Sequence, residues 1–242
     1  MSLNITQIVS QIDRRAGTTN ASYQLADKIE DINIVVDDFF AMAIQAAGVW
    51  QVDDTNHPDY PIIYTNLISG RRDYAFLTDE QGNMILDIHK VMVADANGLY
   101  YEIKPVDQQS VGPKTLINEK NAVGKPSCYD KTGNAIFLDL IPDYNYTHGL
   151  KVFINREGSY FAVSDTTKKP GVAGLFHEYF VIVPAYKWVS AHAKTNADIS
   201  KANRLAAEIQ KLETKIITYY GRRGRDQRNI LTSVGRTRVN YI

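Results

Sequence analysis

Apolar residues near the N-terminus recur at the spacing of an α-helix. Ile5, Ile8, Val9 and Ile12 lie at positions i, i+3, i+4 and i+7, and Gly17 follows as a stop signal. After the polar break TTNAS, apolar residues again recur every three or four positions: Leu25, Ile29, Ile32, Val36, Phe39 and Ala43. The pattern predicts a short and a long helix, which form a helical hairpin over residues 1–49.

Between residues 50 and 170 the helical period is replaced by short apolar segments. They are rich in β-branched and aromatic residues, and Gly, Asn, Asp or Pro separates them. The segments predicted as strands are residues 62–68, 73–78, 84–93, 99–106, 135–140, 151–156 and 159–163. Their even spacing predicts an inserted antiparallel β-sandwich or open barrel.

Two of the turns in this region share the pattern D-x-x-G-N, one starting at Asp79 and the other at Asp130. Asp and Asn close turns with their own side chains and Gly takes a positive φ, so each pattern predicts a hairpin loop. A calcium loop is the weaker interpretation, because the EF-hand spacing and its distal Glu are missing.

Helical periodicity returns over residues 171–221. Residues 175–194 are apolar around most of a helix, which predicts a central helix that Pro184 kinks or splits. The next segment has one apolar seam and a predicted end at Gly221; the seam comprises Ile199, Ala202, Ala206, Ile209, Leu212, Ile216 and Tyr219. The predicted fold is therefore α+β, with N- and C-terminal helices in one bundle, the β module inserted between them, and an extended basic C-terminal tail over residues 222–242.

Composition excludes several protein classes. The single cysteine, Cys128, rules out an internal disulfide framework. The first residues lack the charge pattern of a signal peptide, and no apolar run approaches about 20 residues. We therefore expect a soluble chain made in the cytoplasm, without a membrane segment.

The formal net charge of zero hides an uneven distribution of charge. Acidic residues outnumber basic ones through residue 60, whereas residues 221–242 contain six arginines and one acid, Asp226. This asymmetry indicates electrostatic complementarity between copies or with a charged partner. The alternative is a solvated, disordered tail.

Catalytic motifs are missing from the sequence. The five histidines form no H-x-x-x-H pair, and the chain has no phosphate loop, serine elbow or cysteine-nucleophile signature. Asp87 and Asp139 would be a conceivable glycosidase pair, but strand alternation and exposure explain them more simply. His177, within an apolar segment, is predicted to be a hydrogen-bonded core or subunit-contact histidine. We predict no enzyme activity, no metal and no cofactor.

Several segments together resemble a known family. The opening hairpin, the passage DYPIIYTNLISGRRDYAF with the strand GNMILDIHKVMV, and the helices from GLFHEYFVIVPAYKWVSAHAK to RLAAEIQKLETKIITYYGRR resemble the head-to-tail adaptor, or connector, proteins of tailed bacteriophages. The resemblance spans nearly the whole chain. It depends on the order of these segments and on their patterns of apolar and polar residues more than on any diagnostic motif. The β segment of about residues 60–165 is longer than in compact adaptors.

The resemblance implies a virion structural protein of the neck, assembled in the host cytoplasm. It implies a homo-oligomeric ring, commonly of twelve subunits, which binds the portal protein above and a tail or neck-ring protein below. DNA passes through the ring, so non-specific contact with DNA in the lumen is expected as well.

The resemblance also implies roles for two groups of residues. An acidic helix face is expected at the subunit interface: Asp27, Glu30, Asp31, Asp37 and Asp38. The tail is expected to bind the portal through Tyr219, Tyr220, Arg222, Arg223, Arg225, Arg228, Arg236, Arg238 and Tyr241. Apolar residues alternate with these arginines, which favours a protein partner over DNA.

Two alternatives stay open at this point. One is another tail ring component, such as a tail terminator, which the same composition would allow. The other is a β-sandwich module that binds carbohydrate or a receptor, with Tyr100, Tyr101, Tyr144 and Tyr146 stacking on sugar.

Overall fold

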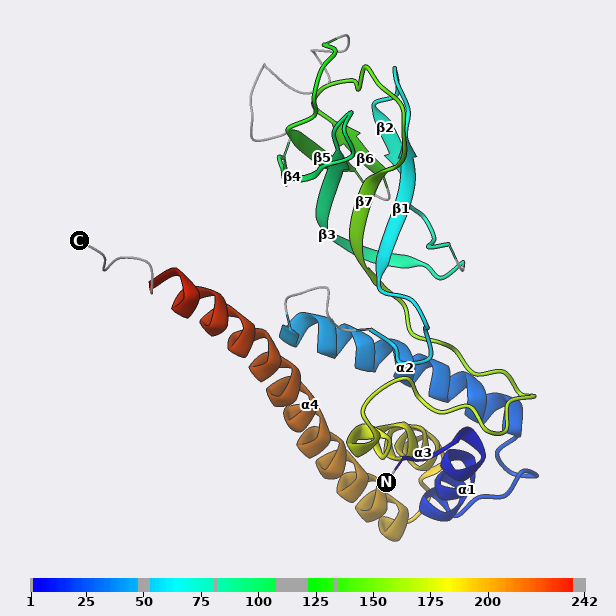
Figure 1. Cartoon of the computed structure of the whole chain (residues 1–242). Helices are drawn as coiled ribbons and strands as arrows, with labels where there is room; N and C mark the ends of the chain where they lie inside the picture. Colours follow the sequence, from blue (N-terminus) through cyan, green and yellow to red (C-terminus); the bar gives the residue numbers. More distant parts are fainter. Residues whose placement is uncertain (1, 48–52, 81, 108–121, 133–134, 237–242) are drawn as a thin grey trace. The chain divides into compact units, whose positions relative to one another are not determined.

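The computed structural model describes residues 2–47, 53–80, 82–107, 122–132 and 135–236, with the backbone alone at 47, 132 and 223–236. It confirms an α+β fold and divides into two compact units. Residues 1–58 and 158–242 form a helical unit, and residues 59–157 form a β unit (Figure 1). The expected module of residues 50–170 extends past the β unit at both ends.

The helical unit contains four α-helices and a short 3₁₀ helix within its described residues. These are α1 (Ile5–Ala16), α2 (Leu25–Ala47), η1 (Gly174–Phe176), α3 (Tyr179–His192) and α4 (Asn196–Arg236). Side chains from all five elements pack into one hydrophobic cluster, so helices from both ends of the chain share a core (Figure 1).

The first helix forms as its periodicity predicts. Ile5, Ile8 and Ile12 are buried, and Asn4 and Gln7 make a reciprocal capping box at the N-terminus. Gly17 ends the helix in the left-handed conformation with φ 76°.

Aromatic side chains fill the centre of the helical core. The ring of Phe39 on α2 contacts Phe176, Tyr179, Phe180 and Tyr220 at centroid distances from 5.6 to 6.2 Å. α3 runs through Pro184 without a break, so of the two predicted outcomes, a kink or a split, the split does not occur. α2, η1, α3 and α4 are thereby held against the same aromatic cluster.

The predicted end of the last helix is wrong. α4 continues through Gly221 to Arg236, so the chain is helical and not extended over residues 222–236. A glycine inside a helix costs about 1 kcal/mol relative to alanine, which neighbouring helix formers offset. Gly221 does not take a positive φ, which is what would have ended the helix. The end of the predicted tail, residues 237–242, lies outside the described residues.

The β unit contains one curled sheet, a half-barrel (Figure 1). Its described strands run in the order β1-β7-β3-β4-β5-β6-β2. Their bounds are β1 Ile62–Leu67, β2 Asp73–Ala75, β3 Ile85–Ala94, β4 Tyr100–Pro105, β5 Cys128–Thr132, β6 Ala135–Leu138 and β7 Tyr146–Arg156. All neighbours are antiparallel except β4 and β5, so the prediction of a wholly antiparallel module is wrong at that pair.

The predicted strand at residues 159–163 does not form. Phe161 is instead buried in the core of the helical unit. The amide of Asn33 on α2 bonds both the N–H and the C=O of Phe161, at 2.8 and 3.0 Å. The Asn33 side chain thus supplies the backbone hydrogen bonds that a neighbouring strand would otherwise provide. This explains why the segment, despite its alternating pattern, forms no strand. β5, which lacks an apolar alternation, was not predicted.

The first D-x-x-G-N turn closes as expected. Asp79 Oδ1 accepts a hydrogen bond from the Asn83 N–H at 2.8 Å, and Gly82 has φ 90°. Asp79 also contacts the guanidinium of Arg156, which is buried at the end of β7. The same guanidinium contacts Asp59, at the start of the unit. At the second turn, residues 133 and 134 lie outside the described part, and β5 and β6 pair on either side of it.

Candidate functional site

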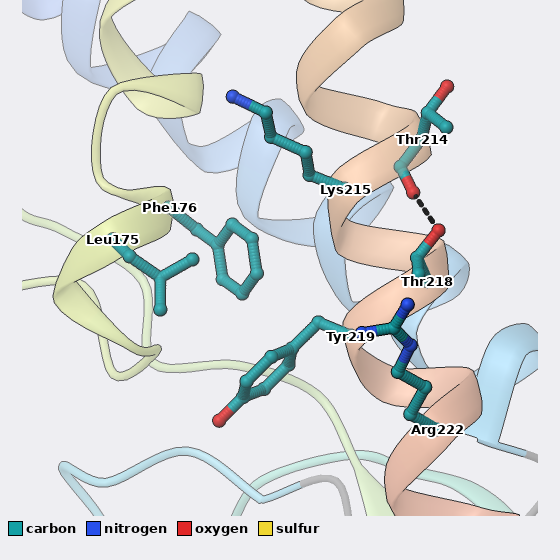
Figure 2. Close-up of a pocket in the computed structure, with 7 residues that line it drawn as sticks. All are labelled: Leu175, Phe176, Thr214, Lys215, Thr218, Tyr219 and Arg222. Carbon is teal, nitrogen blue, oxygen red and sulfur yellow. Dashed lines mark hydrogen bonds between the residues drawn. The ribbon is translucent and has the colours of Figure 1, made fainter.

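A groove opens on the helical unit between η1 and α4 (Figure 2). Its volume is about 640 Å³. The lining residues are Leu175, Phe176, Thr214, Lys215, Thr218, Tyr219 and Arg222.

α4 forms one wall of the groove, and its helical period determines which of its side chains line that wall. Leu212, Ile216 and Tyr220 are buried in the core at intervals of one helical turn. The groove residues of α4 repeat at the same interval on the side next to this seam. Core packing of the seam therefore fixes the orientation of the wall.

Phe176 forms the apolar floor. It is 1% exposed, and its ring meets Tyr219 edge-on at 5.3 Å and stacks on Tyr220 at 6.2 Å. Aromatic packing of this kind restricts the rings to one arrangement. The floor is therefore preformed.

His177 holds η1 in position. The side chain is buried, its Nδ1 accepts a hydrogen bond from the Leu3 N–H at 2.9 Å, and its Nε2 lies 3.1 Å from the Val172 carbonyl oxygen. The Leu3 N–H only donates and the Val172 carbonyl only accepts, so this pair of contacts assigns the proton to Nε2; the Leu3 carbonyl oxygen also lies 3.0 Å from Nδ1. The prediction of a hydrogen-bonded core histidine is confirmed.

The rim of the groove is cationic and partly apolar. Lys215 and Arg222 are exposed and form no ion pair with any acid in the described part of the chain. Leu175 is 59% exposed. The hydroxyl of Thr214 donates to the carbonyl oxygen of Gln210 at 2.9 Å. The hydroxyl of Thr218 donates to the carbonyl oxygen of Thr214 at 2.7 Å (Figure 2). Such a surface suits apolar contact and the binding of acidic groups.

The structure describes the side chains of three of the predicted docking residues and places them in two environments. Tyr219 and Arg222 line the groove. Tyr220 is only 7% exposed and belongs to the core, so its predicted contact with a partner is wrong. The backbone of α4 carries Arg223, Arg225, Arg228 and Arg236, whose side chains are not described. Arg238 and Tyr241 lie outside the described residues.

Two of the predicted interface acids are used within the chain. Asp31 accepts a hydrogen bond from the Tyr23 hydroxyl at 2.5 Å and lies 3.5 Å from Lys187 Nζ. Burial, together with Asp31, raises the pKa of Tyr23 far above its usual value. Asp37 accepts a hydrogen bond from the Tyr160 hydroxyl at 2.7 Å.

The other three predicted acids, Asp27, Glu30 and Asp38, are exposed on α2. They form no ion pair with the residues that the structure describes. Ile34, which lies between them on the same helix, is 44% exposed. α2 therefore presents an acidic surface with an apolar residue at its centre.

The tyrosines proposed for sugar stacking do not form one exposed platform. Tyr101, Tyr144 and Tyr146 pack against the core of the β unit. The hydroxyls of Tyr100 and Tyr144 donate to the carbonyl oxygens of His148 and Ala94, at 2.6 and 2.7 Å. These contacts are those of structural tyrosines.

The described residues contain no group of three or more His, Cys, Asp or Glu side chains arranged to hold a metal ion. None of the helices in the described ranges is long and apolar enough to cross a membrane.

Sequence reasoning missed five of the lining residues: Leu175, Phe176, Thr214, Lys215 and Thr218. The first two residues begin a largely apolar segment that continues to Val183, interrupted by His177 and Glu178, so they were assigned to a central helix. The 3₁₀ turn at Gly174 separates them from α3 and brings Leu175 to the surface. Gly174 before this run was the available signal for such a break.

No protein-family model matches the chain, and no curated protein shows significant similarity to it.

Proposed function

We propose that this chain is a head-to-tail adaptor of a tailed bacteriophage, a structural protein that forms a ring between the portal and the tail and lets DNA pass. The observation that carries the proposal is the length of α4. Tyr220 is the last residue of the described helical core, and α4 continues from there to Arg236. This basic arm, Gly221–Arg236, is about 24 Å long at the rise of an α-helix.

The composition of the basic arm supports a protein partner. It contains Arg222, Arg223, Arg225, Arg228 and Arg236, and arginine forks bind carboxylates and carbonyl oxygens well. Ile230, Leu231 and Val234 lie among these arginines at helical spacing. Helices that dock into protein grooves use apolar anchors at this spacing, whereas a phosphate backbone offers such residues little.

The groove beside the arm supports a structural role over a catalytic one. Its lining residues contain no acid, no histidine and no cysteine, and the hydroxyls of Thr214 and Thr218 are bonded to carbonyl oxygens of α4. Lys215 and Tyr219 therefore have no carboxylate or imidazole in the lining with which to form a nucleophile–base pair. Its apolar floor and cationic rim serve contact with another protein. The virion neck is where such a basic arm and such a groove would both be covered.

The test is deletion of residues 223–242, which removes most of the arm but leaves the groove residue Arg222 in place. We expect the full chain to bind the portal protein encoded in the same genome, and the truncated chain to lose at least about 100-fold in affinity, since the arm supplies the anchors. Because the deletion begins after Tyr220, the last residue of the described core, the thermal unfolding midpoint of the helical unit should not change. Undiminished binding of the truncated chain to the portal would overturn the proposal.

A salt series separates portal binding from DNA binding. If the six tail arginines neutralise phosphates, affinity for duplex DNA will fall with a slope of about −5 on logarithmic axes. Under the proposal, the full chain binds the portal more tightly than it binds DNA at 0.15 M salt. Tighter binding to DNA that is lost with the arm would assign the arm to nucleic acid and contradict portal docking.

A further inference from the structure

Three properties of the groove between η1 and α4 restrict what it binds. Its floor is the buried ring of Phe176, its rim carries the exposed side chain of Leu175, and Lys215 and Arg222 stand free of acidic partners within the described residues. Pockets for small molecules contain polar groups that converge on the ligand. Here the threonine hydroxyls are bonded to α4 itself. The groove therefore fits an acidic protein surface with an apolar centre.

The exposed face of α2 has that chemistry. Asp27, Glu30, Ile34 and Asp38 lie at positions i, i+3, i+7 and i+11, which bring them to one side of a helix. All four are exposed. Burial of Ile34, which is 44% exposed, would add apolar contact at the centre of the acids.

The spacing of the charges agrees on the two surfaces. Lys215 and Arg222 are seven residues apart, about 10 Å along α4, with Tyr219 between them. Glu30 and Asp38 are eight residues apart, about 12 Å along α2, with Ile34 between them. An antiparallel pairing brings Lys215 to Asp38, Tyr219 to Ile34, and Arg222 to Glu30.

We infer that the groove of one copy of this chain binds the acidic face of α2 of a second copy. The inference rests on the proposed function, because a ring of identical subunits needs contacts between two different surfaces, and it names those surfaces. Each copy carries both surfaces, so the contact repeats from copy to copy and closes if the rotation allows. Complementary charge then sets the register of the subunits.

Cysteine cross-linking tests the contact directly. The chain has one cysteine, Cys128, in the β unit, and replacing it with serine gives a background without thiols. Ile34→Cys and Leu175→Cys are then introduced, one in each of two samples of the full chain, and the samples are mixed at 50 μM with a short bismaleimide. We expect cross-linked dimers only in the mixture, and a ladder of dimers, trimers and larger species when one chain carries both cysteines.

The outcomes distinguish the alternatives. Dimers from Ile34→Cys alone or from Leu175→Cys alone would show a symmetric contact and overturn the inference. No cross-linking in the mixture, at 50 μM or on the portal, would overturn it as well. If the chain cross-links but fails to bind the portal, the inference stands and the proposed function is contradicted. If it binds the portal but does not cross-link, the proposed function stands and the inference is contradicted.

Charge reversal gives a second measurement. Lys215→Glu with Arg222→Glu on one chain, and Glu30→Lys with Asp38→Lys on another, should each weaken self-association at least tenfold in sedimentation velocity. A mixture of the two variants should associate again, because opposite charges then face each other. These side chains are exposed, so the unfolding midpoint of each variant should stay near that of the parent. A mixture that stays as dissociated as its components would contradict the pairing.

Discussion

The ammonium nitrogen of Lys28 lies 2.7 Å from Oδ1 of Asp13, across the connection between α1 and α2. The Lys28 side chain is fully buried, and it also donates to Asn20 Oδ1 at 2.8 Å. Asp13 accepts a further hydrogen bond from the Thr18 hydroxyl at 2.7 Å. One buried cation therefore ties the end of α1, the connecting loop and the start of α2 together.

Replacing Lys28 with methionine should destabilise the helical unit. The substitution keeps the volume but leaves Asp13 and Asn20 without their buried partner. Breaking a fully buried pair costs about 3–5 kcal/mol; because Asp13 is 24% exposed, water replaces part of the loss, and we expect about 2 kcal/mol. Urea unfolding measures it, with the exposed Lys211→Met as the matched control, expected within about 0.5 kcal/mol of the parent. Equal midpoints for the two variants would contradict the role of Lys28.

Gly171→Ala should destabilise the same unit for a steric reason. A Cβ at this position would lie 1.4 Å from Oδ1 of Asp54. Asp54 is buried and accepts hydrogen bonds from the N–H groups of Asn56 and Ser159, at 2.7 and 2.8 Å, so it has no free direction in which to move. We expect a loss of about 2–3 kcal/mol in the free energy of unfolding.

Gly221→Ala is the control for this substitution. Among the described residues, its Cβ would meet the carbonyl oxygen of Ala46 alone, at 3.7 Å. An alanine inside a helix is more stable than a glycine by about 0.5–1 kcal/mol. The unfolding midpoint should therefore rise, and a fall would contradict a continuous α4 at this position.

Arg156→Met should destabilise the β unit. The substitution leaves the carboxylate of Asp79, which is 4% exposed, without its buried cation, and we expect a loss of about 3 kcal/mol. Arg156→Lys keeps the charge but not the fork that reaches both Asp59 and Asp79, so its cost should be intermediate. Thermal unfolding with limited proteolysis reports the effect; a lysine variant as stable as the parent would show that charge alone suffices.

Asp87 should make the β unit sensitive to acid. Burial alone would raise the pKa of Asp87, but hydrogen bonds from Lys131 and the Ile88 N–H, with the charge of Lys131, outweigh it and lower the pKa below its usual value. A carboxyl whose pKa is lowered by folding stabilises the protein above its unfolded pKa of about 4, and this contribution is lost as the pH falls through the folded value.

We therefore expect Asp87→Asn to narrow the stability difference between pH 7 and pH 3. The side chain of Asp87 is 44% exposed, so the effect should stay below about 1 kcal/mol. Urea midpoints at several pH values measure it, with Asp73→Asn on β2 as the control. Parallel pH profiles for the parent and Asp87→Asn would contradict the pairing with Lys131.

Periodicity predicted the elements whose burial is local and regular. The isoleucines of α1 and the stop at Gly17 were read correctly because one helical face and one left-handed cap determine them. The strand at residues 159–163 failed because its partner is the side chain of Asn33, which is remote in sequence. β5 was missed because Lys131 and Asp130 interrupt its apolar pattern and only Tyr129 is buried within it.

The candidate site was predicted only in part for similar reasons. Tyr219 and Arg222 were identified from the aromatic and basic composition of the segment. The sequence put Tyr219 on the apolar seam of the last helix, but Tyr220 takes that core position and Tyr219 is 42% exposed. Which of the two faces the core depends on the rotational phase of α4, which advances by about 100° per residue. Leu175 and Phe176 could be assigned to the groove only from the turn at Gly174. This turn leaves Leu175 exposed and buries Phe176.

The clasp between Arg156 and Asp59 joins the two ends of the β unit. Arg156 Nη2 donates to the carbonyl oxygen of Asp59 at 2.9 Å, so the chain leaves this unit beside the point where it began. Insertions are tolerated where the ends of a domain lie close together. Recombination that exchanges everything between these two residues would return the chain to the same place, so the β unit can be exchanged as a single segment.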